Sequence, residues 1–170
     1  MQRRVELDLG LPPAALPGRV LNELYAHARE AQPEECCGLI LGDGGERFAR
    51  VVRCRNDMTK QHHRNPRAFP RDNRSAFYLD PRDYKAAEEG AEAAGQRVTA
   101  LYHSHVDVAE GGGVYLSEMD LDYAEGELFP WPDAAHIVIA VCEDRVLGVG
   151  LFERDRESRS FRGRAVEAAQ

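Results

Sequence analysis

One apolar run of the chain ends directly in two histidines that are two residues apart. Val98–Tyr102 has the character of a buried strand, and His103 and His105 follow it in the order His-Ser-His. Residues i and i+2 of a strand point to the same face of a sheet, so both imidazoles should leave the strand end side by side. The pattern therefore predicts a buried strand whose end presents two nitrogen ligands, an arrangement that suits a divalent metal.

Further polar side chains in the sequence extend this candidate site. Asp120 offers a carboxylate and Ser117 a hydroxyl. Two histidines and one acidic ligand, with a fourth position left to water, are typical of a catalytic zinc site, so a metallohydrolase is the leading hypothesis. Such an enzyme also needs a general base. Glu34 and Glu35, just before the apolar run Cys36–Leu41, are candidates, and composition does not choose between them.

Hydrophobic spacing and turn residues predict an α/β fold. Helices are expected over about 17–30, from Asp80-Pro81 to a stop at Gly95, and from Ser117 to about 126. The expected strands are 5–11, 36–41, 46–54, 76–79, 97–102, 135–142, 146–152 and 159–162. Helices and strands are interspersed and hairpins dominate the strand connections. We therefore expect a single domain over 1–170, with a mixed, mainly antiparallel sheet flanked by helices.

Two polar segments interrupt this pattern. Residues 55–75 are polar and basic with two prolines, which predicts a long loop that is functional or mobile without a partner. His62 and His63 within it are interpreted as surface residues rather than a second metal site. Residues 106–116 form a glycine-bearing loop beside the candidate site. Outside both segments, His27 is expected at a helix surface or core edge, and His136 in a structural role.

Composition limits the classes of function. The chain has 170 residues, of which 43% are hydrophobic, and this is enough to form a core. Its formal net charge of −7 disfavours a nucleic-acid-binding protein. No apolar run reaches the length of a membrane span and no secretory signal is evident, so we expect a cytoplasmic protein with no membrane partner. The four cysteines show no C-x-x-C spacing, so we expect reduced, mostly buried thiols.

Taken in order, the motifs resemble those of the JAMM (MPN-plus, Mov34/PAD-like) zinc metalloproteases, and the likeness extends over most of the chain. Members of that family carry Glu-x-Cys-Gly opening a strand, matched by Glu35–Gly38. They carry His-Ser/Thr-His at a strand end, matched by His103–His105, and Ser-x-x-Asp at a helix start, matched by Ser117–Asp120. Each pattern alone is weak, whereas the ordered set is specific.

The resemblance, closest to small stand-alone bacterial-type members, implies a function and a role for each residue. His103, His105 and Asp120 would hold Zn²⁺, Glu35 would be the general acid/base acting on the zinc-bound water, and Ser117 would stabilise the oxyanion. The architecture implied is JAMM/cytidine-deaminase-like. The activity implied is a zinc metallopeptidase or isopeptidase (deubiquitinase-like) that cleaves at the C-terminal tail of a ubiquitin-like or sulfur-carrier protein. A homodimer is left open.

The chain departs from the family pattern between the second histidine and the serine. Val106–Leu116 is longer than the usual family segment, and Gly113 stands where the serine is expected. We interpret this as an expanded active-site loop, with the extra length absorbed by Gly111–Gly113. Val106 also replaces a common proline. These departures concern the shape of the loop and the substrate preference more than the ligand set.

Alternative interpretations exist for single residues and for the whole chain. Ser117-x-x-Asp120 is also a capping-box pattern, and a capping Ser117 can still present its hydroxyl. Asp107 and Glu110 either contact substrate or face water.

A non-catalytic scaffold or binding module of the same fold is disfavoured by the complete ligand set. A zinc nucleoside-type deaminase would need His-x-Glu and Pro-Cys-x-x-Cys, which are absent. The acidic charge argues mildly against a relative from the DNA-repair branch.

Overall fold

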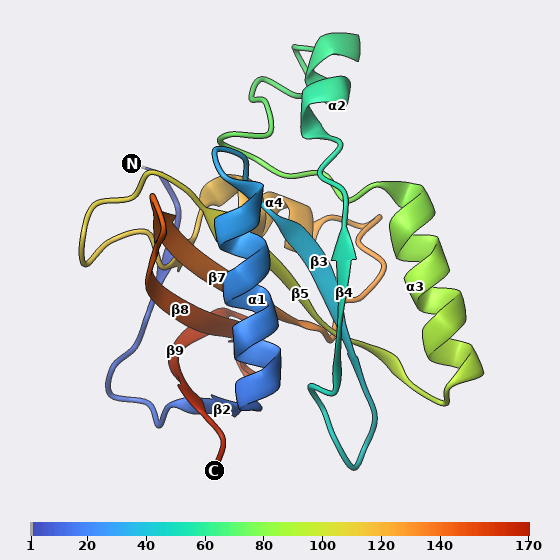
Figure 1. Cartoon of the computed structure of the whole chain (residues 1–170), viewed down its shortest axis with the longest axis vertical. Helices are drawn as coiled ribbons and strands as arrows, with labels where there is room; N and C mark the ends of the chain where they lie inside the picture. Colours follow the sequence, from blue (N-terminus) through green and yellow to red (C-terminus); the bar gives the residue numbers. More distant parts are fainter. Residues whose placement is uncertain (1) are drawn as a thin grey trace.

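Helices and strands alternate along the chain around a central mixed sheet. A computed structural model describes residues 2–170. The strands are β1 (Val5–Glu6), β2 (Ala14–Leu16), β3 (Cys37–Gly42), β4 (Arg50–Cys54), β5 (Arg97–His105), β6 (Tyr115–Leu116), β7 (Ala135–Cys142), β8 (Arg145–Arg154) and β9 (Phe161–Ala168). The helices are α1 (Gly18–Ala31), α2 (Met58–Arg64), α3 (Pro81–Ala93) and α4 (Glu118–Glu125). Seven strands form the main sheet in the order β2-β9-β8-β7-β5-β3-β4 (Figure 1). The strands β1 and β6 pair in a small second sheet.

The helices cover both faces of the main sheet. In Figure 1, α1 lies in front of the sheet, α3 lies beside β4, and α2 projects away from the sheet at the top. Ala100 and Tyr102 of β5 pack in the cluster with α1, whereas Leu101 packs in the cluster with α3. Neighbouring residues of β5 therefore point to opposite faces, as a pleated strand requires. His103 and His105 share the face of Leu101, on the side away from α1.

The observed architecture confirms the predicted fold class. The helices expected over 17–30, from Asp80-Pro81 and from Ser117 are present as α1, α3 and α4. Antiparallel pairs dominate the sheet, while β5–β7 and β2–β9 are parallel. All four cysteines are free thiols, as expected, and three of them are buried. No helix in the described part of the chain is long and apolar enough to cross a membrane.

The polar segment 55–75 differs from the expected continuous loop, because it contains α2. The strand expected at 76–79 is also wrong, since only a single bridge joins Asn56 to Leu79. The amide N–H of Tyr78 instead donates to the Asn56 side chain at 3.0 Å, and the Asp57 N–H donates to the Tyr78 carbonyl at 2.8 Å. A few hydrogen bonds from residues 56–57, more than twenty positions away, therefore replace a strand ladder here.

Other boundaries also differ from the prediction: the strand expected at 5–11 is limited to Val5–Glu6, and the strand expected at 46–54 begins at Arg50. Three more differences concern strand pairing. The strand β2 follows two prolines and was not expected, because its three residues gain their pairing only from β9 at the other end of the chain. The strand β9 extends to Ala168, well beyond the expected 159–162. The loop expected over 106–116 ends in β6, which pairs with β1. All three depend on partners distant in sequence, which local patterns do not reveal.

Gly38 of β3 leaves room for a buried tyrosine next to the first histidine. The β3–β5 register pairs Gly38 with Tyr102, and a Cβ at Gly38 would lie 2.5 Å from atoms of the Tyr102 ring. The Tyr102 ring is fully buried, and its hydroxyl is 2.7 Å from His27 Nδ1 on α1. The motif glycine thus has a packing role, because it allows Tyr102 to link β5 with α1 directly before His103.

We expect the substitution Gly38→Ala to destabilise the fold. The added methyl group would overlap a ring that cannot move away, so the free energy of unfolding should fall by about 1–3 kcal/mol. Urea denaturation measures this change. Gly44→Ala is the matched control, since its Cβ would meet nothing within 4 Å. An unchanged midpoint for Gly38→Ala would contradict the packing role.

Candidate metal centre

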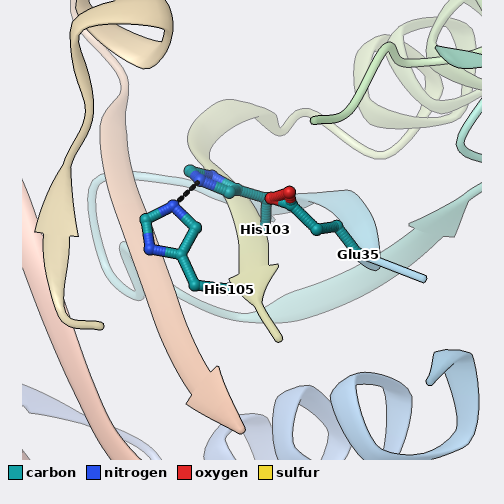
Figure 2. Close-up of side chains that lie close together, drawn as sticks. All are labelled: Glu35, His103 and His105. Atoms are coloured by element: carbon teal, nitrogen blue, oxygen red, sulfur yellow. Dashed lines mark hydrogen bonds between the residues drawn. The ribbon is translucent and has the colours of Figure 1, made fainter. Parts of the chain in front are cut away.

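The register between β3 and β5 brings Glu35 to the two histidines. Cys37 pairs with His103, and the Ser104 N–H donates to the Cys36 carbonyl at 3.1 Å. The antiparallel ladder therefore continues one step beyond the start of β3, and Glu35 lies opposite His105. Figure 2 shows the Glu35 carboxylate beside the imidazoles. Glu35 lies two residues before the start of β3, and the histidines lie at the end of β5.

The Nε2 atoms of the two imidazoles face each other, and little of either ring is exposed. His103 Nε2 and His105 Nε2 are 3.2 Å apart, and the side chains are 1% and 13% exposed (Figure 2). The expectation that both rings leave the strand on one face is therefore met. Two ring nitrogens at this distance repel if both present lone pairs, so the pair requires a proton or a cation between them.

Asp120 completes a set of three facing donor atoms. Its Oδ2 is 3.3 Å from His103 Nε2 and 3.5 Å from His105 Nε2. Burial alone would raise the pKa of Asp120, but the two imidazoles outweigh burial and hold that pKa well below its usual range. The carboxylate is therefore kept as an anion, which is the form that binds a cation.

The start of α4 fixes the position of Asp120. Ser117 is the N-cap: its Oγ accepts from the Asp120 N–H at 3.1 Å, and its own N–H donates to Asp120 Oδ2 at 2.9 Å. This is a complete capping box. The capping interpretation and the site interpretation of these two residues are thus both compatible with the structure. The Ser117 hydroxyl proton is not used by the cap.

The two histidines are oriented in different ways. The His103 ring stacks on Phe77, with centroids 4.4 Å apart, and its buried Nδ1 has no hydrogen-bond partner among the described residues. His105 Nδ1 lies 2.7 Å from the Gly113 carbonyl oxygen, and its ring packs on Tyr115 with centroids 5.0 Å apart. His103 is therefore held by packing, whereas His105 is held by a hydrogen bond as well.

Glu35 is the other acidic group of the cluster and is 4% exposed. Its carboxylate and the ring nitrogens of His103 and His105 lie within 4.8 Å of one another. Burial raises the pKa of Glu35 to about 8; the charge of His105 opposes this effect and that of Asp120 adds to it. Unlike Asp120, Glu35 makes no ion pair with either imidazole in the described part of the chain.

The polar segment 55–75 holds the backbone of Glu35. The Glu35 N–H donates to the Asn73 carbonyl at 2.8 Å, and Asn56 Nδ2 donates to the Glu35 carbonyl at 3.0 Å. The same Nδ2 donates to the Ala76 carbonyl at 3.0 Å, while Asn56 Oδ1 accepts two backbone N–H groups. Asn56 is therefore the residue that ties this segment to the start of β3. The sequence held no signal for it, because a lone asparagine in a polar segment looks like any loop residue.

The remaining candidate residues lie outside the cluster. Glu34 is exposed, and His62 Nδ1 is 2.6 Å from the Phe69 carbonyl, within its own segment. His136 is buried on β7 and packs against the ring of Phe129. Glu110 is exposed and lies 3.6 Å from Arg145. Asp107 is exposed in the same loop.

Comparisons with known proteins identify the family and support the fold. The model of a family described as prokaryotic homologs of the JAB domain matches residues 17–154, a span that includes every candidate site residue. The fold is similar to solution structures of proteins from Desulfitobacterium hafniense (TM-score 0.61) and Salinibacter ruber (TM-score 0.57). Each is 20% identical to this chain, and each comparison covers 92% of both chains. No protein of curated function matched the chain.

We expect Asn56→Ala to destabilise the segment that carries Glu35. The substitution removes four side-chain hydrogen bonds of 3.0 Å and leaves backbone groups without partners. The free energy of unfolding should fall by about 2–4 kcal/mol, measured by urea denaturation. Asn65→Ala, which removes one hydrogen bond in the same segment, is the control and should cost under about 1 kcal/mol. Equal losses for the two variants would refute the linking role of Asn56.

Proposed function

Because the chain belongs to the family of prokaryotic homologs of the JAB domain, we propose that it is a zinc-dependent peptidase or isopeptidase. The observation that carries the proposal is the convergence of three donor atoms, His103 Nε2, His105 Nε2 and Asp120 Oδ2, beside the buried carboxylate of Glu35. In this proposal the first three residues are the ligands and Glu35 moves the proton.

The spacing of the donor atoms supports zinc. Zinc bonds to histidine nitrogen and carboxylate oxygen are about 2.0–2.2 Å long, so neighbouring corners of a tetrahedral site are about 3.3–3.5 Å apart. The three separations between the donor atoms are 3.2, 3.3 and 3.5 Å. Three protein ligands leave a fourth position open, as in catalytic rather than structural zinc sites.

Two carboxylates lie near the imidazoles, and their contacts support different roles. Asp120 Oδ2 is within 3.5 Å of both ring nitrogens, which is the separation expected between two ligands of one ion. Glu35 lies near the same nitrogens but forms no ion pair with them in the described residues. We therefore assign Asp120 as the ligand and leave Glu35 free for proton transfer.

The proposed mechanism divides the hydrolysis among these residues. A bound zinc ion supplies Lewis-acid polarisation and makes water a nucleophile near neutral pH. Glu35 accepts a proton from the attacking water and returns it to the departing amine. The Ser117 hydroxyl, whose proton the helix cap does not use, donates a hydrogen bond to the substrate carbonyl oxygen as negative charge develops there. The burial of Glu35 strengthens these charge interactions, because little water competes with them.

The surroundings of Glu35 support a protein substrate with an acidic surface. Exposed basic side chains without ion pairs gather in the described segment 55–75; they are Lys60, Arg64, Arg67, Arg71 and Arg74. The segment reaches the site, since Asn73 binds the Glu35 backbone and the charge of Arg71 acts on the Glu35 pKa. We propose a ubiquitin-like or sulfur-carrier protein, cleaved at its C-terminal tail, with acidic groups facing this segment.

We expect one zinc ion to bind per chain through the three assigned ligands. His105→Ala should weaken zinc binding by more than about 100-fold, because losing a ligand costs more than losing a hydrogen-bonded partner of a ligand. Competition with a chromophoric chelator measures the affinity. His63→Ala removes an exposed histidine in segment 55–75 and should bind zinc like the wild type. Wild-type affinity in His105→Ala would exclude this site.

Cleavage should depend on Glu35 and not on its neighbour. Zinc-loaded protein is incubated with ubiquitin-like and sulfur-carrier precursors that carry C-terminal extensions, and products are followed by mass spectrometry. Glu35→Gln should lower the cleavage rate by about 10²–10⁴-fold, since it removes the general acid/base. The matched control is Glu34→Gln, one residue away and exposed, which should leave the rate unchanged. Equal rates in both variants would overturn the assigned mechanism.

A further inference from the structure

We infer that Gly113, in the expanded loop 106–116, is a positioning residue that sets His105 for metal binding through its backbone carbonyl. This inference rests on the proposed zinc site. It gives the expanded loop a function, because the residue standing where a serine is expected instead provides the hydrogen-bond partner of a ligand.

The hydrogen bond determines which nitrogen of His105 is available. The Gly113 carbonyl oxygen can only accept, so at 2.7 Å the His105 Nδ1 must be the protonated nitrogen. In a neutral imidazole Nε2 then carries the lone pair. Nε2 is the atom that faces His103 and Asp120. The carbonyl therefore sets both the tautomer and the ring direction that metal binding requires.

Only glycine fits the backbone at this position. Gly113 has φ +85°, a left-handed conformation that other residues rarely adopt, and a Cβ there would lie 2.5 Å from Val108 Cγ1. An alanine at this position would force the loop to shift, and the carbonyl would move with it. By contrast, a Cβ at Gly111, with φ +78° in the same loop, would meet nothing within 4 Å.

The surroundings make His105 depend on this loop. Tyr115 packs on its ring, and the Arg4 guanidinium lies 4.2 Å above the Tyr115 ring. Strand β1 pairs with β6 and so holds Tyr115 in place. His103 has no equivalent carbonyl, because its Nδ1 has no partner among the described residues and its ring rests on Phe77. A loop displacement should therefore affect His105 more than His103.

The first test compares two glycine substitutions by zinc affinity. We expect Gly113→Ala to weaken zinc binding by about 10–100-fold, the usual effect of losing a hydrogen-bond partner of a ligand. Chelator competition measures the affinity, and thermal unfolding of the metal-free protein checks the fold. Gly111→Ala is the matched control, because it shares the left-handed strain but not the carbonyl bond, and should bind like the wild type. Equal affinities of both variants would overturn the inference.

The second test needs no variant and no metal. Nitrogen-15 NMR of the metal-free wild-type protein, at a pH where the imidazole is neutral, identifies the tautomer of His105. We expect the proton on Nδ1, and a proton on Nε2 would overturn the inference even if Gly113→Ala fails to fold. The two proposals fail separately: a wild type that binds no zinc contradicts the metal site, whereas unchanged zinc affinity in Gly113→Ala contradicts only the role of Gly113.

Discussion

The antiparallel pairing of β3 with β5 determines where the acid/base candidate and the histidines meet. From Cys37 to Ile40 each residue of β3 faces a fixed residue of β5, so the Cys37–His103 pair places Glu35 opposite His105. A shift of one residue would turn Glu35 to the face of α1 and separate it from both imidazoles. Gly38 and Tyr102 lie in the same register and fill the space on the α1 face. The same strand register therefore allows Tyr102 to pack against Gly38 and brings Glu35 to the histidines.

Secondary-structure termini supply the other groups. Asp120 serves two purposes with one oxygen, because Oδ2 accepts the Ser117 N–H and also faces the imidazoles. A side chain that completes the cap of its own helix has little rotational freedom. The carboxylate is consequently held in place before any ion arrives, and little ordering remains to be done on binding. Helix capping and ligand positioning are here one interaction.

Local patterns were sufficient for those parts of the site that lie close together in sequence. The same-face placement of His103 and His105 follows from strand periodicity, and the start of α4 follows from its cap. Composition left Glu34 and Glu35 as equal candidates, and only the family resemblance singled out Glu35. The β3–β5 register, which no local pattern contains, explains why Glu35 is the one that meets the imidazoles. For the same reason Asn56 and Phe77 were missed, since each acts on a residue more than twenty positions away. The short strands β2 and β6 escaped prediction because their pairing comes from β9 and β1.

The small β1–β6 sheet has a consequence for how much of the chain the site requires. Strand β1 lies before residue 17, where the family match begins, yet it pairs with the residues that lead into Ser117. Arg3 also pairs with Asp122 and Glu125 on α4. Likewise β9 lies after residue 154, where the match ends, and pairs with β8 in the main sheet. A protein trimmed to the matched span would keep every candidate ligand and lose the outer supports that hold two of them in place.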